Sequence, residues 1–210
     1  MPAADEIRSH IERHIGSIHQ VFNDFEDQSS PVSVQHVEPT ETRPVHTLIT
    51  LGLSARAMAV PPGNDSPKFL ELMVTLPRDW QLGSEHITKQ EWAWPVRLLH
   101  TLARSSSSSE SWIGWGDLIP NGDPPKPYAT STRQCVAFVV PSLLVPTDFY
   151  ELNVPGKNIA FFGVVPLYKE EWQLGLKQGT KALIERMVDR DVNDVVDPKR
   201  KNVARWRWSW

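Results

Sequence analysis

The sequence has a single cysteine, Cys135, among its 210 residues. One cysteine excludes an internal disulfide and suits a reducing compartment. No apolar run approaches the roughly 18–20 residues that a membrane-spanning helix needs. The first residues, Met1 to Arg8, lack the basic stretch followed by an apolar one that marks a secretion signal. We therefore expect a cytoplasmic protein without a membrane span.

Sequence motifs for catalysis are also missing. There is no P-loop pattern, no Gly-x-Gly-x-x-Gly after a strand and no Gly-x-Ser-x-Gly. Cys135 begins an apolar run, which fits a small buried side chain better than an activated thiolate. The neighbouring carboxylates Glu170 and Glu171 say nothing about spacing across a cleft, so they do not indicate a glycosidase-type pair. We expect no catalytic residues and no cofactor.

Histidine spacing gives one signal for a metal. His10 and His14 lie four residues apart in an expected helix, and histidines at that spacing can share a metal ion. No second group of His or Cys ligands appears, and the His-Glu-x-x-His pattern is absent. We therefore expect no metal site and interpret both histidines as solvated surface side chains.

Composition places the chain among soluble globular proteins, with 40% apolar and 22% charged residues. Its unusual counts are nine tryptophans and 18 prolines, and tryptophan is favoured both in cores and at interaction surfaces. The formal charge is −3, but residues 198–210 contain five basic and no acidic residues, so the remainder carries −8. An acidic body attracts a basic partner and disfavours nucleic acid.

Apolar periodicity predicts a first helix over residues 3–25, with one stripe formed by Ile7, Ile11, Ile15, Ile18 and Phe22. A second helical region is expected from Ser84, broken or restarted at Pro95. Helical sequence returns after residue 166, with Gly179 as a break before a final amphipathic helix. The five-serine run 105–109 predicts a flexible loop that could act as a flap.

Runs rich in β-branched residues predict the strands. We expect them at 32–37, 45–52, 69–76, 135–140, 150–154 and 158–165. The first two can pair as a hairpin, and the last two flank a tight turn at 155–157. Because strands and helices do not alternate regularly, the order predicts one α+β domain with a mixed, mainly antiparallel sheet packed with helices.

The stretch 111–124 interleaves Trp with Gly, which is unusual in a strand unless a bulky group needs the vacated space. We expect a pinched strand that ends in a sharp exposed turn at 120–123. The candidate partner-binding residues of this stretch are Trp112, Trp115, Asp117, Asn121 and Asp123. An ordinary buried strand and turn, with both tryptophans in the core, remains open.

The last residues, Lys199–Trp210, differ from the rest of the chain. In an extended chain Trp206, Trp208 and Trp210 share one face, while Arg205 and Arg207 share the other. This pattern can bind membranes or single-stranded nucleic acid. An edge strand packed on the body, or a disordered tail, is the alternative. We divide the chain into a domain over residues 1–197 and a basic tail over 198–210, which could add a contact to a partner.

Five segments together resemble the suppressor of fused (SUFU) family, in particular its stand-alone bacterial members. They recur in the order of the family and span about residues 32–197. The segments are Arg43–Ser54, Glu71–Trp80, Trp94–Arg104, Trp112–Gly116 with Ile119–Pro124, and Val165–Glu171. Members of the family often carry His where this chain has Asp117, and an aromatic and acidic loop where it has the serine run.

The resemblance implies an α+β domain that works by binding protein. Eukaryotic relatives hold a transcription factor by gripping an extended peptide, and bacterial stand-alone copies look like immunity proteins that neutralise toxins. We therefore expect an immunity protein that occludes a basic toxin domain. One alternative is a peptide-binding regulatory adaptor that uses an exposed sheet edge. Another is an enzyme that uses the Trp-Gly stretch with Asp117, Asp123 or His100 as acid or base.

Overall fold

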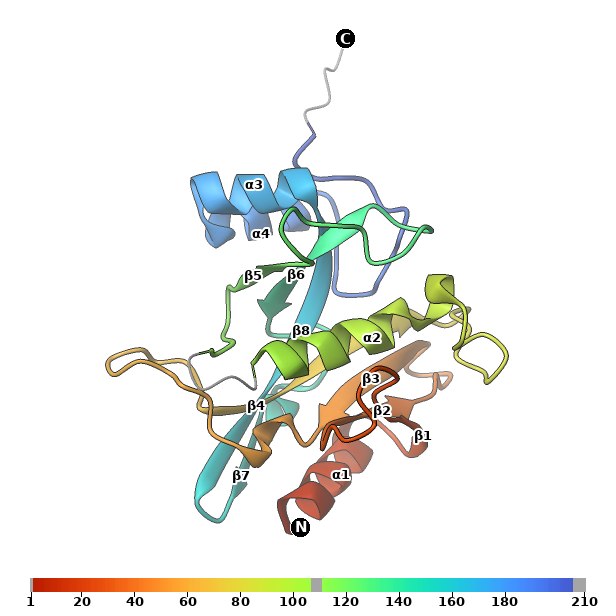
Figure 1. Cartoon of the computed structure of the whole chain (residues 1–210), viewed down its shortest axis with the longest axis vertical. Coiled ribbons are helices and arrows are strands. Elements are labelled where there is room, and N and C mark those ends of the chain that lie inside the picture. Colours follow the sequence, from red (N-terminus) through yellow and green to blue (C-terminus); the bar gives the residue numbers. More distant parts are fainter. Residues whose placement is uncertain (1, 107–110, 206–210) are drawn as a thin grey trace.

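The computed structural model describes residues 2–106 and 111–205, and its centre is a mixed sheet of eight strands (Figure 1). Across the sheet the order is β1 (Ile18–Phe22), β2 (Ser33–Val37), β3 (Val45–Leu51), β4 (Phe69–Pro77), β8 (Lys157–Tyr168), β6 (Gln134–Val140) and β5 (Leu118–Pro120). β7 (Glu151–Val154) also pairs with β8. β4 and β8 run parallel, and the other pairs are antiparallel.

Within residues 2–106 and 111–205, four α-helices cover the two faces of this sheet: α1 (Pro2–His14), α2 (Gln90–Ser105), α3 (Lys169–Gln178) and α4 (Thr180–Val188). α2 shares its core with Leu48, whereas α1 shares its core with Ile49. Consecutive strand residues point to opposite faces, so these two helices lie on opposite sides of the sheet. α3 and α4 pack against β6 and β8 at the far end (Figure 1). No helix in the described ranges is both long and apolar enough to span a bilayer.

The predicted α+β architecture with a mixed, mainly antiparallel sheet is confirmed. β2 and β3 form the expected hairpin, with Val34 opposite Thr50. β7 and β8 form the second one, around Gly156 in the left-handed region at a φ of 80°. Cys135 is buried in β6, as its apolar context predicts. Runs of buried residues fix these strands because both faces of the sheet are covered.

The predicted helix over residues 3–25 is wrong in its second half. α1 ends at His14, Gly16 has a positive φ of 144°, and residues 18–22 form the edge strand β1. A spacing of four residues keeps side chains on one face of a helix and also on one face of a strand. The recurrence at Ile18 and Phe22 is therefore compatible with either pattern, and pairing with β2 selects the strand. A register shift between Ile18 and Gln20 then places Ile18 against the core of α1, whereas Phe22 joins the core of α2.

Pro95 does not break the helix, contrary to expectation. α2 is continuous from Gln90 to Ser105 with Pro95 inside it, and residues 84–89 form turns ahead of it. Proline removes one backbone hydrogen bond from a helix interior. Trp94, Pro95 and Val96 are all buried, so their packing offsets this local cost.

The Trp-Gly stretch is not a strand. Residues 111–114 are irregular, 115–116 form a turn, and β5 begins only at Leu118. Gly116 has a φ of 91°, which side chains rarely adopt. A Cβ on Gly114 would lie 2.6 Å from Ser66 Oγ, so Gly114 permits the close approach of another loop. Of the serine run 105–109, which we expected to act as a flap, Ser105 ends α2 and Ser106 caps it, and residues 107–109 lie outside the described residues.

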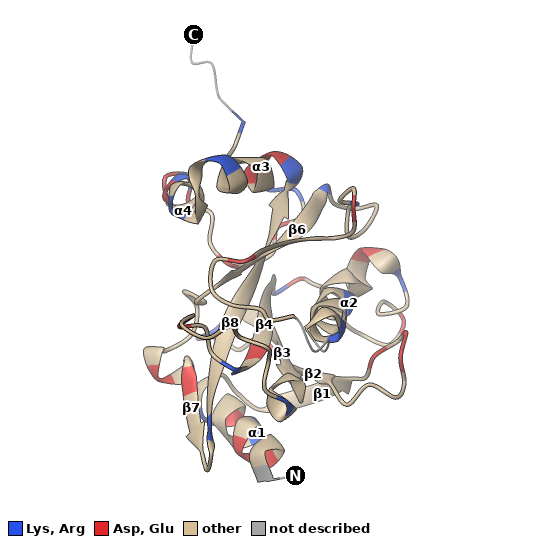
Figure 2. Ribbon diagram, turned by 60° about the vertical axis from the view of Figure 1, so that its left-hand side comes forward, with Lys and Arg blue, Asp and Glu red and all other residues tan. Residues whose placement is uncertain are grey.

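Charged residues of both signs are distributed over the molecule. Figure 2 shows acidic residues on α1, on β7 and on α3, rather than on one element alone. Basic residues accompany them on α1 and α3. The excess of negative charge therefore does not define a binding surface by itself.

Candidate functional site

The loop that carries the predicted partner-binding residues lies between α2 and β6. Trp115 exposes 63% of its surface, whereas Trp112 is half-buried and packs against the core beneath α2. The two tryptophans therefore differ: Trp112 holds the loop on the body, and Trp115 presents an indole to solvent.

Backbone contacts make this loop rigid. The Gly114 N–H donates to Asp117 Oδ2 at 2.8 Å, and the Val139 N–H donates to the Asp117 carbonyl at 3.0 Å. Partial burial raises the pKa of the Asp117 carboxyl, and the bond from Gly114 opposes that shift. Asn121 Nδ2 donates to the Lys126 carbonyl at 2.7 Å, while Asp123 is exposed. Asp117 and Asn121 are thus turn-forming residues as well as surface residues.

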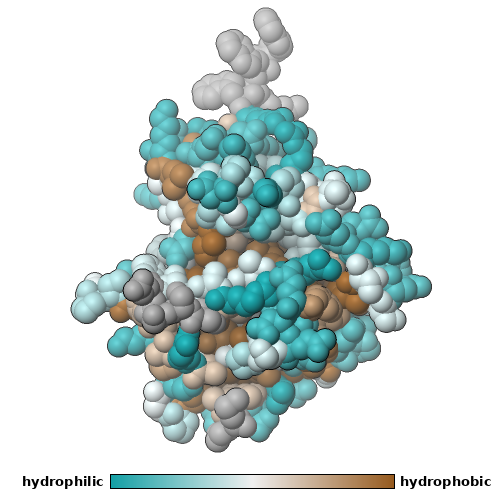
Figure 3. Space-filling view, in the orientation of Figure 1, coloured by the Kyte–Doolittle hydropathy of each residue, from teal (hydrophilic) through white to brown (hydrophobic). Residues whose placement is uncertain are grey.

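Apolar surface surrounds the loop on the side of α3 and α4. Leu118 packs so closely that a Cβ on Gly175 would lie 2.7 Å from its Cδ1. One residue further along α3, Leu176 is 64% exposed. Figure 3 shows hydrophobic surface gathered in a hollow between α3 and α2, at the level of β5 and β6. Trp115, three residues before Leu118, and Leu176, next to Gly175, are therefore exposed apolar side chains close in sequence to this contact.

A second feature, which the sequence did not predict, is an open cleft of about 1150 Å³. One wall is formed by the turn after β4 and the start of α2, with Asp79, Trp80, Glu91 and Trp92. The opposite wall is the segment 189–201, which follows α4. Ser131, at the end of the loop that begins with Asn121 and Asp123, also lines the cleft.

Two tryptophans form the aromatic part of the cleft. Trp80 Nε1 donates to the Trp92 carbonyl at 3.0 Å, and the two rings are T-shaped with centroids 5.4 Å apart. Trp80 also meets Trp94 of the core at 5.9 Å. Because Trp80 is buried and bonded, the partly exposed Trp92 is held in a fixed position at the cleft surface.

The opposite wall is attached to the sheet. Val195 forms a parallel bridge with Thr75 of β4, and the Val196 N–H donates to the Thr75 carbonyl at 2.9 Å. Just before this bridge, Asp194 is buried and accepts a hydrogen bond from the Ser142 hydroxyl. β8 pairs with β4 only from Phe69 to Met73. Beyond that point, at Thr75, the segment around Val195 pairs with β4 instead.

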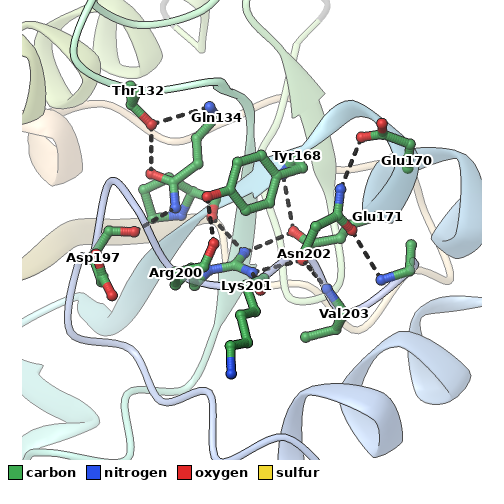
Figure 4. Close-up of polar contacts among 12 residues, drawn as sticks. Thr132, Gln134, Tyr168, Glu170, Glu171, Asp197, Arg200, Lys201, Asn202 and Val203 are labelled. Carbon is green, nitrogen blue, oxygen red and sulfur yellow. Dashed lines mark hydrogen bonds and ion pairs between the residues drawn. The ribbon is translucent and has the colours of Figure 1, made fainter. Parts of the chain in front are cut away.

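A buried ion pair fixes the rest of that wall (Figure 4). Glu171 in α3 is fully buried, and both its oxygens accept bonds from Arg200, at 2.6 and 2.7 Å. The backbone N–H groups of Tyr168 and Val203 also donate to Glu171, at 2.9 and 2.8 Å. The Tyr168 hydroxyl donates to the Arg200 carbonyl at 2.6 Å. A buried bidentate pair with these extra bonds holds one conformation.

The first half of the basic tail is therefore packed on the body. Val203 is buried among α3 and α4, and Arg205 pairs with Glu170 at 3.1 Å. The division of the chain at 197/198 stays a prediction. Trp206, Arg207, Trp208 and Trp210, on which the aromatic pattern depends, lie outside the described residues.

The histidines do not form a reactive site in the described chain. His10 is buried, not solvated: its Nε2 contacts the Phe149 carbonyl at 3.1 Å, and its ring stacks on Phe149. The neighbouring His14 packs against His10 with ring centroids 4.6 Å apart. His100, one candidate acid or base, is 1% exposed and lies 3.8 Å from Asp24, so a substrate in solution does not reach it. No three His, Cys, Asp or Glu side chains of residues 2–106 and 111–205 are placed to hold a metal ion.

Sequence reasoning missed two fully buried carboxylates, those of Glu71 and Glu171. Glu71, inside the apolar strand β4, is fully buried and accepts bonds from the Thr50 hydroxyl, the Gly52 N–H and Ser54. Burial raises the pKa of Glu71, and these donors oppose the rise. A charged residue within an otherwise apolar run was the available signal. Its partners in β3 and the loop after it could not be read from β4 alone.

Comparison with known proteins gives a consistent result. The family model described as Suppressor of fused protein (SUFU) matches residues 28–201. No curated protein matches the chain.

Solved structures of the family share the fold. A putative SUFU homolog from Neisseria gonorrhoeae FA 1090 has a TM-score of 0.69 and 14% identity, with 99% of each chain covered. The structure of the Sufu–Fu complex gives 0.64 and 14%, covering 96% of this chain and 91% of that one. Drosophila Suppressor of Fused gives 0.61 and 15%, covering 96% of this chain and 50% of that one. Because the family model spans most of the sequence, the chain belongs to the suppressor of fused family.

Proposed function

We propose that this protein is a protein-binding module, and that it acts as an immunity protein that neutralises a cognate bacterial toxin by covering it. Two lines of support come from relatives: one family structure is a complex of Sufu with Fu, and another belongs to a bacterium. In this role the protein is not an enzyme, it acts in the cytoplasm, and its partner is a basic toxin domain.

The observation that carries the proposal is the exposed indole of Trp115 on a loop fixed to β6. Tryptophan is enriched among the residues that dominate binding energy, and a side chain held in place before binding loses little entropy on association. Leu176 of α3, next to the Gly175 that Leu118 contacts, is a second exposed apolar side chain. Asp117, Asn121 and Asp123 supply polar groups around it, as the rim of an interface requires. Trp112 supports the loop from beneath.

The test is co-expression with toxin genes that neighbour the gene for this protein. The intact chain should restore growth and form a complex that survives gel filtration. Trp115→Ala should weaken the complex by about 2 kcal/mol, or roughly 30-fold in Kd, which is typical of a central anchor. Leu143→Ala is a matched control, since Leu143 is 73% exposed in a loop after β6. Failure of every adjacent toxin gene to yield rescue or a complex contradicts the proposal.

A regulatory adaptor is the second candidate, and the open edge of the sheet favours it. β1 is the first strand in the sheet order, and its Val21 is 48% exposed. An extended peptide can add to such an edge through main-chain hydrogen bonds. Replacing Val21 with Pro removes one main-chain N–H from β1 and should abolish binding only in this mode, with retention of the fold checked by thermal unfolding. A pull-down that returns disordered segments rather than folded toxin domains would support the adaptor.

A further inference from the structure

The cleft between α2 and the segment 189–201 lies apart from the loop that carries Trp115, and its lining has a definite chemistry. Both walls contribute carboxylates: Asp79 and Glu91 on one side, Asp189, Asp191 and Asp197 on the other. None of the five forms an ion pair with another residue in the part of the chain that the structure describes.

Basic residues line the same cleft but do not balance these carboxylates. Arg200 is committed to the buried Glu171 carboxylate. Arg190, Lys199 and Lys201 remain, so the unpaired carboxylates exceed the uncommitted basic groups by two. A concave surface with one excess sign of charge concentrates ligands of the opposite sign.

The aromatic part of the cleft narrows the choice of ligand. Trp92 is partly exposed and is fixed by its bond and ring contact with Trp80. A guanidinium group stacks on an indole face and also forms paired hydrogen bonds with carboxylates, whereas its aliphatic stem packs on apolar surface. An arginine side chain uses both features of this cleft.

We propose that the cleft is a second docking site, which receives an arginine-bearing basic segment of the protein partner. The inference rests on the proposed function for the existence of that partner. The arginine lies against Trp92 between Asp79 and Glu91 on one wall and the aspartates on the other. The wall of residues 195–203 is preformed by the Thr75 bridge and the Glu171–Arg200 pair, so little ordering is needed on binding.

A peptide titration tests the site without any toxin. The probe is acetyl-Gly-Arg-Gly-Arg-Gly-amide, and the control is the same peptide with glutamine in place of arginine. The indole N–H resonance of Trp92, assigned through its loss in Trp92→Phe, is followed by NMR on the full chain. The arginine peptide should shift this resonance saturably, and the glutamine peptide should not. High salt should weaken the binding, since the contact is between exposed charges.

Charge-neutralised variants locate the binding. Asp189→Asn with Asp191→Asn should lower the affinity for the arginine peptide about fivefold, the effect of losing two modest ion pairs. Asp191 has a φ of 52°, a conformation that asparagine tolerates, so the fold is retained. Glu6→Gln with Glu12→Gln removes the same charge from α1, away from the cleft lining, and should leave the affinity unchanged.

Three results overturn the proposal: no saturable shift, equal affinity in the Asp189/Asp191 double variant, or binding only after residues 206–210 are deleted. The last would mean that the basic tail of the chain, not a partner, is the occupant. Toxin rescue is scored separately. Rescue without peptide binding rejects the cleft site alone, and peptide binding without rescue rejects the immunity function alone.

Discussion

Replacing Arg200 with Ala tests whether the buried ion pair holds one wall of the cleft. Arg200 is 9% exposed and Glu171 is fully buried, so the substitution leaves a carboxylate in the interior without its cation. Breaking a buried pair in this way costs about 3–5 kcal/mol. Glu171 keeps the hydrogen bonds from the Tyr168 and Val203 N–H groups, so we expect the free energy of unfolding to fall by about 3 kcal/mol.

The loss is measured by urea unfolding, followed by tryptophan fluorescence at neutral pH. Arg205→Ala is the matched control, because its pair with Glu170 is 57% and 44% exposed and contributes about 0–1 kcal/mol. Changing Glu171 and Arg200 together to Met removes the unpaired charge and should restore part of the stability, because the Tyr168 and Val203 N–H groups lose their acceptor. Because residues 197–205 can be released locally, hydrogen exchange at the Val203 amide is measured as well. Equal stability in Arg200→Ala and Arg205→Ala, with unchanged Val203 exchange, would refute the reasoning.

Three further substitutions probe other parts of the molecule. Burial lowers the pKa of His36 to about 4, so the unfolded chain binds more protons between pH 6.5 and 4. Stability should fall by about 3 kcal/mol as the pH falls through that window, and His36→Gln should flatten this fall in urea midpoints. Glu71→Gln places an amide donor against donors such as Ser54, and should cost about 1–3 kcal/mol in the same assay. Gly114→Ala should cost about 1–3 kcal/mol by overpacking. Gly83→Ala should change the melting temperature little, because its Cβ would lie 3.9 Å from His86 Nδ1, an ordinary van der Waals contact.

The sequence predicted the sheet better than the helices because buried strands leave a local signature. β3, β4 and β6 are runs of buried β-branched and aromatic residues, and such a run is recognisable without knowledge of its neighbours. The end of α1 is a different case, because Ile18 and Phe22 fit helical and strand spacing equally. Pairing with β2, a contact with residues 34–37, decided between them.

The candidate sites depended on contacts that no local pattern encodes. The cleft joins the turn after β4 to a segment more than 100 residues later in the chain. Its wall is held by Glu171 and Arg200, which are 29 residues apart. The stretch around Trp115 was predicted as a strand, but Gly116 and the bond from Gly114 to Asp117 make it a turn. A Trp-Gly repeat alone does not separate these two backbone conformations.

Four of the five segments that carry the family resemblance contribute buried contacts of the fold. Ser54 and Glu71, from two of these segments, bind each other. Trp80 and Trp94, from two of them, meet in the core, and Glu171 ends a further one. An unpartnered buried carboxylate is costly, so such residues are constrained by the fold whatever the protein binds. Trp115, which we propose for recognition, lies in the remaining segment, but it and the carboxylates beside Trp92 are exposed and can change without this penalty. Resemblance in the buried residues therefore identifies the scaffold, and the partner must be inferred from the exposed residues.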